Sequence, residues 1–304
     1  MRPTTARRIA GGAAAVLLLA AAMAAVAAMA CSASSKGAAA RDAGALDDVS
    51  PGVEAAAEAM ENGDGNVYAE PEGGPAGYVF FSMDPGAGTS SLGAVFDDDP
   101  VPAAHCHVTS VYGACVVFTC AGGSDAGSTA TAGTLTFDAP SLDGGVGVDA
   151  DPSGLYEAPA QGALFGAGDP LTVTASGGQV PAFGPSSVAA PGLITLTSPL
   201  VEGGALTVST SSDLSFAWTG GSVDSVAILS ASGAATDGSL VVARCSYVAI
   251  TDEGILPSAV LMPLHGLTEG AVGWGQANAA TVDAGAWSVT LLAGAYGSTP
   301  ATFE

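Results

Sequence analysis

The fold is constrained most by an alternation of apolar and small polar residues, which recurs in short runs from Tyr78 to the C-terminus. Successive side chains of a β-strand point to opposite faces, so an alternating run predicts a strand with one apolar face and one polar face. The clearest runs occupy residues 134–137, 171–174, 194–197, 214–219 and 287–291. Glycine, proline, aspartate and serine separate these runs, without intervening amphipathic helical patterns. We therefore predict an all-β protein built of antiparallel β-sandwiches.

Glycine and proline indicate how the chain is divided. The sequence contains 43 Gly and 18 Pro among 304 residues, a composition that favours frequent turns and β-structure over helices. A proline-flanked stretch at residues 185–191 is the expected joint between two modules. We predict one or two sandwich modules, the first at 76–191 and the second at 192–304.

The second module contains a pattern typical of one group of β-sandwiches. Leu214, Phe216 and Trp218 alternate with smaller residues, and an apolar run at 226–229 follows them. This resembles the second strand of immunoglobulin-like and fibronectin type III modules, with its core tryptophan, and the strand after it. The resemblance implies an Ig-like sandwich for residues 192–304. It does not assign an activity, because such folds serve many functions.

The first 30 residues read as a signal peptide. Arg2, Arg7 and Arg8 precede an uncharged, mostly apolar stretch at 13–30, and small residues end it. The end of this leader reads Ala-Met-Ala before Cys31 and resembles the signature of bacterial lipoproteins. The resemblance implies that Cys31 bears a lipid that attaches the protein to a membrane. Ser32 stands where an Asp would signal retention at the inner membrane, so the outer membrane is the expected location.

Two other interpretations of the leader stay open. It could be cleaved at the same bond without lipidation, which would make the protein secreted or periplasmic. It could also remain as a membrane-spanning anchor, although alanine is only mildly hydrophobic. Residues 31–75 are rich in small and acidic residues and are expected to form a flexible tether. A short helix at 51–61, capped by Ser50, is predicted within this tether.

The five cysteines are consistent with export. Lipidation of Cys31 would leave four, Cys106, Cys115, Cys120 and Cys245, in an oxidising compartment. Gly113 is the natural turn residue of a hairpin that sets Cys106 opposite Cys120, and we predict this disulfide. Cys115 would point to the other face. It would either bond to Cys245 or stay buried as a small apolar residue.

The charge balance excludes several functions. After residue 30 the chain has 29 Asp and Glu against three Lys and Arg, so its formal net charge is 3 minus 29, or −26. Arg244 is the only basic residue beyond Arg41. Such a chain cannot neutralise a row of phosphates, which makes nucleic-acid binding improbable, and it lacks the lysines of phosphate-binding and Schiff-base sites.

His105 and His107 are the sharpest local motif. Two residues apart on a strand, they would point to the same face and could bind zinc or copper, with the Asp97-Asp98-Asp99 run or His265 completing the ligand set. An exposed strand beside a structural cysteine explains the same residues without a metal. The sequence indicates no cofactor, and it contains none of the common nucleophile or zinc-protease motifs.

These features predict an exported, lipid-anchored protein of the cell envelope with a non-catalytic binding or structural role. The partner would be a protein or a glycan in addition to the membrane. Two alternatives remain: a metal-binding envelope protein that uses His105 and His107, and a secreted hydrolase without a recognisable motif.

Overall fold

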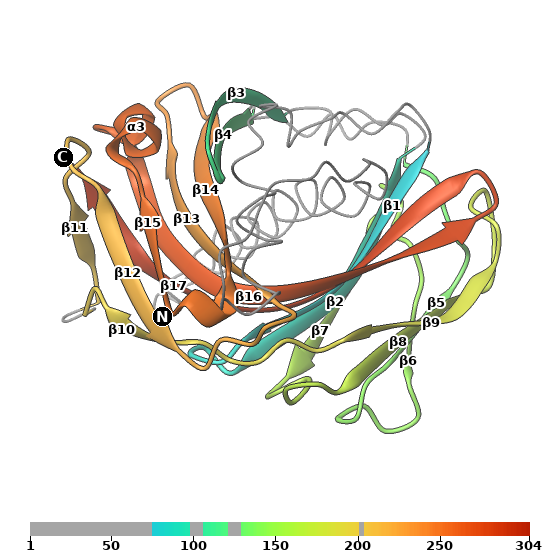
Figure 1. The fold of residues 1–304 in the computed structure, drawn as a ribbon. Coiled ribbons are helices and arrows are strands. Elements are labelled where there is room, and N and C mark those ends of the chain that lie inside the picture. The colour runs from blue at the N-terminus through green and yellow to red at the C-terminus, as the bar shows by residue number, and fades with distance from the viewer. Residues whose placement is uncertain (1–74, 98–105, 121–128, 201–203) are drawn as a thin grey trace, which may run out of the picture.

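The computed structural model describes residues 75–97, 106–120, 129–200 and 204–304 (Figure 1). In these ranges most residues lie in β-strands, which form three sheets, and the helices are short. The prediction of an all-β sandwich fold is confirmed.

Several sequence predictions fall outside the described residues. These are the signal peptide 1–30, Cys31, the tether at 31–75 except its last residue, the helix at 51–61 within it, and His105. Within the described residues, no helix has both the length and the apolar composition needed to cross a membrane.

The largest sheet has ten strands. In spatial order they are β3 (Cys106–Tyr112), β4 (Cys115–Cys120), β14 (Leu240–Val248), β13 (Val226–Ala234), β16 (Thr268–Ala284), β17 (Trp287–Phe303), β1 (Ala76–Asp84), β2 (Thr89–Asp97) and β7 (Tyr156–Gln161), with β11 (Leu206–Val208) beside the end of β17. Strands β1 and β11 run parallel to β17, and all other pairs in the sheet are antiparallel.

Two smaller sheets pack on this large one. The four-stranded sheet contains β6 (Val146–Val148), β5 (Leu135–Asp138), β8 (Pro170–Ala175) and β9 (Phe183–Ala189). The three-stranded sheet contains β10 (Thr195–Ser198), β12 (Leu214–Thr219) and β15 (Glu253–Leu256), followed by the short helices α3 (Ser258–Leu261) and η3 (Met262–Leu264), and η2 (Ala249–Thr251) precedes β15. Figure 1 shows that the large sheet is curved and that both smaller sheets lie outside the curve, near opposite ends.

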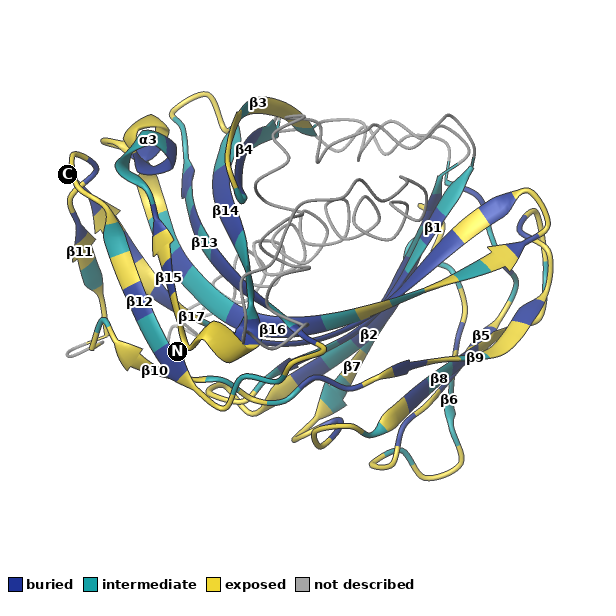
Figure 2. Ribbon diagram, in the orientation of Figure 1, coloured by how far each residue is buried: buried dark blue, intermediate teal, exposed yellow. Residues whose placement is uncertain are grey.

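The β16–β17 hairpin is the spine of the molecule. Each strand has 17 residues, or about 56 Å of extended chain, and Gly285 opens the turn between them with a φ of +69°. Odd-numbered residues of β17 point to the outer face. Near Trp287 they join the core under the four-stranded sheet, and near Phe303 they join the core under the three-stranded sheet. Figure 2 shows buried residues in the middle of both strands.

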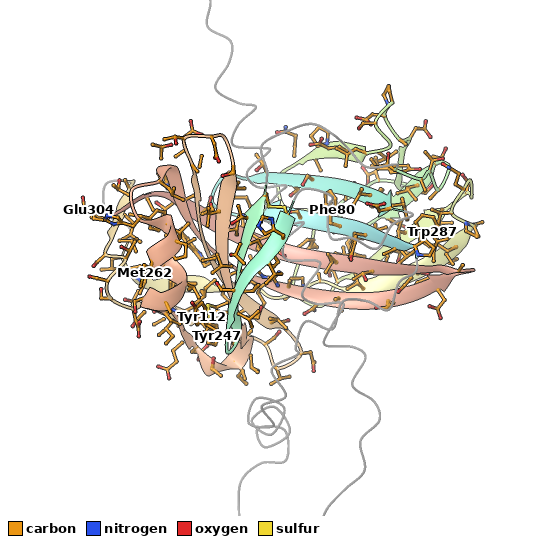
Figure 3. The ribbon with its side chains drawn as sticks, turned by 90° about the horizontal axis from the view of Figure 1, so that it is seen from above. Phe80, Tyr112, Tyr247, Met262, Trp287 and Glu304 are labelled. Carbon is orange, nitrogen blue, oxygen red and sulfur yellow. A yellow bond between two sulfur atoms is a disulfide. The ribbon has the colours of Figure 1, made fainter. Side chains whose placement is uncertain are left out.

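Aromatic side chains fill both cores. In the first core Phe81 meets Phe137 edge to face at 5.4 Å, and Phe96 meets Tyr156 in the same way at 5.8 Å. In the second core Trp218 is 1% exposed. In Figure 3 the two cores lie at opposite ends, with Trp287 at one end and Met262 and Glu304 at the other.

The predicted boundary between residues 191 and 192 does not divide the large sheet. Strands β1 and β2 come from before this point, and they share the sheet with β13, β16 and β17 from after it. The first core includes Val289 and Leu291, and the second includes Cys115 and Val117. Whether the two segments fold as separate modules therefore stays a prediction.

Candidate functional site

The β3–β4 hairpin contains the cysteines that the sequence singled out. Gly113 has a φ of +56° at its turn, and Cys106 lies opposite Cys120, to which it is disulfide-bonded. Cys115 lies opposite Cys245 on β14 and bonds to it. Two disulfides are typical of proteins that fold outside the cytoplasm, in an oxidising compartment.

The histidines are not gathered into a metal site within the described residues. His107 is exposed on β3 opposite Thr119. His265 is exposed after η3, with its Nδ1 3.3 Å from Oγ1 of Thr210. No three His, Cys, Asp or Glu side chains converge in the described part of the chain. Because His105 lies outside it, the metal site stays a prediction.

A groove lies on the outer face, between the two smaller sheets. It has a volume of about 590 Å³ and is lined by the β1–β2 turn at 84–87, the start of the three-stranded sheet at 193–196, and residues 274–275 and 295–298 of the spine. This volume is in the range of small-molecule sites, which are usually apolar clefts with a few polar groups. Leu193 is 46% exposed and Trp274 is half-buried at the groove.

Contacts among the residues that line the groove fix its shape. The carboxylate Oδ1 of Asp84 accepts hydrogen bonds from the backbone N–H groups of Gly86 and Ala87, at 2.9 and 3.0 Å, and so fixes the turn. Trp274 lies beside Gly297 in the neighbouring strand, where an added Cβ would come within 3.0–3.1 Å of the indole. Glycine is therefore what allows the indole to lie flat against the sheet. Such a ring can stack on a planar or sugar ligand.

Polar amides lie beside the groove at the junction of the two cores. Gln276 is fully buried, and its Nε2 donates a hydrogen bond to Oγ of Ser222 at 2.8 Å. Asn278 donates from Nδ2 to the carbonyl of Ala189 at 2.9 Å. These two hydrogen bonds connect β16 to the segments that contain Ser222 and Ala189, both of which cross its outer face. Between the two apolar cores, the contacts of β16 with these segments are therefore polar.

The opposite face of the large sheet has a different character. We call it the inner face, defined by the side chains of Tyr78, Phe80, Val116, Phe118, Ile228, Val242, Arg244, Ala277, Leu292 and Tyr296. Strand registers place these residues on one side: Phe80 lies beside Leu292, and Arg244 lies between Val116 and Ser230. In Figure 1 the sheet curves toward this face.

Arg244 and Tyr296 are the polar centre of the inner face. Arg244 is 2% exposed on β14, and Tyr296 lies three strands away on β17. Arg244 is in register with Ser230 and Gly273, which carry little side chain, and the ring of Tyr296 lies over Gly294, where an added Cβ would come within 2.2–2.4 Å of it. Burial raises the pKa of Tyr296 to about 12, and the positive charge of Arg244 opposes part of that rise.

Sequence reasoning did not predict this face or the groove. It identified Arg244 only as a rare basic residue, although a lone cation inside an apolar run is a signal of a buried charge. It did not single out Trp274, whose surroundings Gly273, Gly275 and Ala277 do not form an alternating apolar run.

Comparisons with known proteins assign neither a family nor a function. No family model and no curated protein matches the chain. Among solved structures, native E. coli alpha-2-macroglobulin aligns with 76% of this chain at 12% identity and a TM-score of 0.19, and the trypsin-activated form aligns with 73% at 12% and 0.19. The FN1-FN3 domains of chicken CNTN1 align with 65% at 9% identity and a TM-score of 0.18. The chain spans 14% and 15% of the two macroglobulin chains and 66% of the CNTN1 chain.

Proposed function

We propose that the chain is an exported cell-envelope protein, anchored in the outer membrane by a lipid on Cys31, whose body binds a partner without catalysis. The observation that carries the binding role is the groove of about 590 Å³ beside Trp274. The leader supports export, and the two disulfides fit an oxidising compartment.

The groove favours a glycan of the envelope as its partner. Trp274 offers a flat apolar ring, while Thr195 and Ser298 bring hydroxyl groups to the same walls. An aromatic platform with a few hydrogen-bonding groups suits a sugar ring, which has apolar faces and a polar rim. A protein partner is the alternative occupant.

Metabolic labelling tests the anchor. The full chain and its Cys31→Ala variant are expressed in a Gram-negative host with a radioactive lipid precursor, and the purified proteins are compared. We expect label in the wild type and none in the variant, since lipoproteins are acylated on this cysteine alone. Equal labelling of both, or of neither, would remove the anchor and leave a secreted or periplasmic protein.

Sedimentation with purified cell-wall polysaccharide tests the groove. We expect the wild type to bind and Trp274→Ala to bind about tenfold more weakly, which corresponds to about 1.4 kcal/mol. Met262→Ala is the matched control, because Met262 is 65% exposed at the far end of the second core. If Trp274→Ala and Met262→Ala bind like the wild type, the groove is not the binding site.

A further inference from the structure

Strand β3 is an edge of the large sheet that lacks the usual sequence features against pairing. Within the described residues it pairs with β4 on one side and with no strand on the other. At the opposite edge, β7 carries Glu157 and Pro159, which both oppose the addition of a strand. The other described edge strands, β6, β10, β11 and β15, have only three or four residues, and β9 contains Pro185. Strand β3 has seven residues, none of them Asp, Glu, Lys, Arg or Pro.

This edge strand also exposes apolar side chains. Val108 is 41% exposed, Val111 40% and Tyr112 44%, so three of the nine large apolar side chains that are exposed in the described residues lie on β3. Figure 2 shows most of the strand as exposed. Apolar side chains gathered on an open sheet edge are typical of a surface that another chain covers.

A β-bulge brings the two valines to one face of the sheet. Val108 lies opposite Phe118 and Val111 lies opposite Val116, and both of these partners belong to the inner face. Residues three apart in a regular strand would point to opposite faces, but the register of β3 shifts by one residue at Thr109. The valines therefore extend the apolar inner face to the edge of the sheet.

The main chain of Val111 is turned away from β4. The hairpin turn consists of residues 113–114, so Tyr112 and Cys115 form the hydrogen-bonded pair that closes it. Hydrogen-bonded and non-hydrogen-bonded pairs alternate along antiparallel strands, which makes the next pair, Val111 with Val116, non-hydrogen-bonded. The N–H and C=O groups of Val111 therefore point outward, where an added strand would bond to them.

Two disulfides hold this edge in place. The Cys106–Cys120 bond ties β3 to β4, and the Cys115–Cys245 bond ties β4 to β14. An edge that is already fixed loses little conformational entropy when another strand pairs with it.

Charge favours a second copy of this chain as the partner. After residue 30 the chain has 29 acidic and three basic residues, so two copies repel each other over most of their surfaces. Residues 106–120 contain no Asp, Glu, Lys or Arg, so two copies can meet at this hairpin without that repulsion. A basic partner would instead be attracted to the acidic surface elsewhere. An antiparallel edge is also complementary to itself across a two-fold axis.

We propose that two copies of the chain pair through their β3 strands, antiparallel about a two-fold axis, so that their large sheets form one continuous sheet. Val111 of each copy contributes its outward N–H and C=O groups, and the exposed valines pack across the axis. A strand of seven residues is about 23 Å long, which gives a smaller contact than a standard interface. The dimer should therefore be weak and reversible. This proposal depends neither on the groove nor on the lipid anchor.

Sedimentation equilibrium tests the dimer. Residues 31–304 with Cys31→Ala, in which the other four cysteines are disulfide-bonded and no thiol can link two copies, are measured from about 10 μM to about 1 mM. We expect a monomer–dimer equilibrium that strengthens with salt, because salt screens the repulsion between the acidic bodies. A monomer over the whole range, or a dimer that weakens with salt, would overturn the proposal.

Substitutions at Val111 distinguish main-chain pairing from side-chain contact. Val111→Pro removes the outward N–H and leaves the hydrogen bonds between β3 and β4 intact, so it should weaken the dimer about tenfold or more. Val111→Ala keeps the N–H and should weaken it less. If Val111→Pro dimerises as strongly as the wild type, the strands do not pair through their main chains.

Charged variants keep the test decisive if the proline disturbs the fold. Val108→Asp with Val111→Asp places like charges on both sides of the axis and should abolish the dimer. Leu200→Asp with Val223→Asp adds the same charge where the side chains are 71% and 65% exposed, and should leave the dimer intact. Equal dimerisation of the two double variants, whether retained or lost, would show that β3 is not the contact.

Discussion

The single side chain of Trp218 connects the three-stranded sheet to η2. Its Nε1 donates a hydrogen bond to the carbonyl of Ala249 at 2.8 Å, and its backbone N–H donates to the backbone carbonyl of Asp252 at 2.9 Å. Trp218→Phe keeps much of the apolar contact and removes the indole donor, so the free energy of unfolding should fall by about 1–3 kcal/mol. Trp218→Ala should cost about 3–5 kcal/mol. Urea unfolding measures both, and a Trp218→Phe variant as stable as the wild type would show that the hydrogen bond contributes nothing.

Tyr296 should make stability depend on pH in the alkaline range. Its pKa is raised to about 12 in the folded chain, against about 10 for an unfolded tyrosine, so the folded state holds the phenol proton more tightly. The stability from this group is complete below pH 10 and is lost as the pH rises toward 12. We expect the free energy of unfolding to fall more steeply over this range in the wild type than in Tyr296→Phe. Urea unfolding at stepped pH, with absorbance at 295 nm, measures the difference.

Burial also raises the pKa of Tyr156 and Tyr247, which remain in the Tyr296→Phe variant. They account for any alkaline loss that both proteins share. If the free energy of unfolding falls equally in the wild type and in Tyr296→Phe between pH 10 and 12, the loss of stability does not come from Tyr296.

Single residues were predictable from sequence where their role is local. Cys106 and Cys120 are separated by one hairpin, and Gly113 marks its turn, so their pairing could be predicted from spacing. The environments of Arg244 and Trp274 depend on strands that are distant in sequence, and no local spacing encodes them. The sequence could name Arg244 as unusual but could not place it on a buried sheet face.

Among the elements of the fold, the β3–β4 hairpin is the one that two disulfides constrain within the described residues. The Cys106–Cys120 bond closes a loop with a sequence separation of 14, and the Cys115–Cys245 bond closes one of 130. Because the loss of unfolded-state entropy grows with loop length, we expect their removal to cost about 3 and about 5 kcal/mol respectively. Denaturant midpoints of the two double Cys→Ala variants test this order. A larger loss for the shorter loop would mean that folded-state contacts, rather than loop length, decide the result.

Strands were predictable where large and small side chains alternate. The run at 214–219 is β12 in full, and the run at 171–174 falls within β8. Strand β16 was not predicted, because Gly273, Gly275 and Ala277 lie where large side chains would otherwise show the alternation. Their smallness has a physical reason, since a Cβ added at Gly275 would overlap the ring of Tyr296.

The arrangement of the whole molecule depends on pairings that the sequence does not signal. Strand β1 lies parallel to β17, with Phe80 beside Leu292, more than 200 residues away along the chain. Alternation indicates which residues are strands and which side is apolar, but it carries no information about distant partners. The sandwich fold class could therefore be predicted, whereas the shared ten-stranded sheet could not.

This shared sheet leads to a prediction for unfolding. Since β16 and β17 contribute to both cores, the two cores should unfold together. Trp287 reports on the first core, and Trp218 reports on the second. In each variant that retains only one of these tryptophans, with Trp274→Phe in both, the fluorescence midpoint in urea should coincide with that variant's midpoint from far-ultraviolet circular dichroism, which reports on the whole molecule.

A destabilising substitution distinguishes one unit from two. Leu135 is fully buried in the first core, and Leu135→Ala should cost about 2–5 kcal/mol. In a cooperative molecule it lowers the midpoint reported by Trp218 as much as the one reported by Trp287, although Trp218 belongs to the other core. If only the Trp287 transition moves, the cores unfold independently, and the spine does not couple the two sandwiches that it joins.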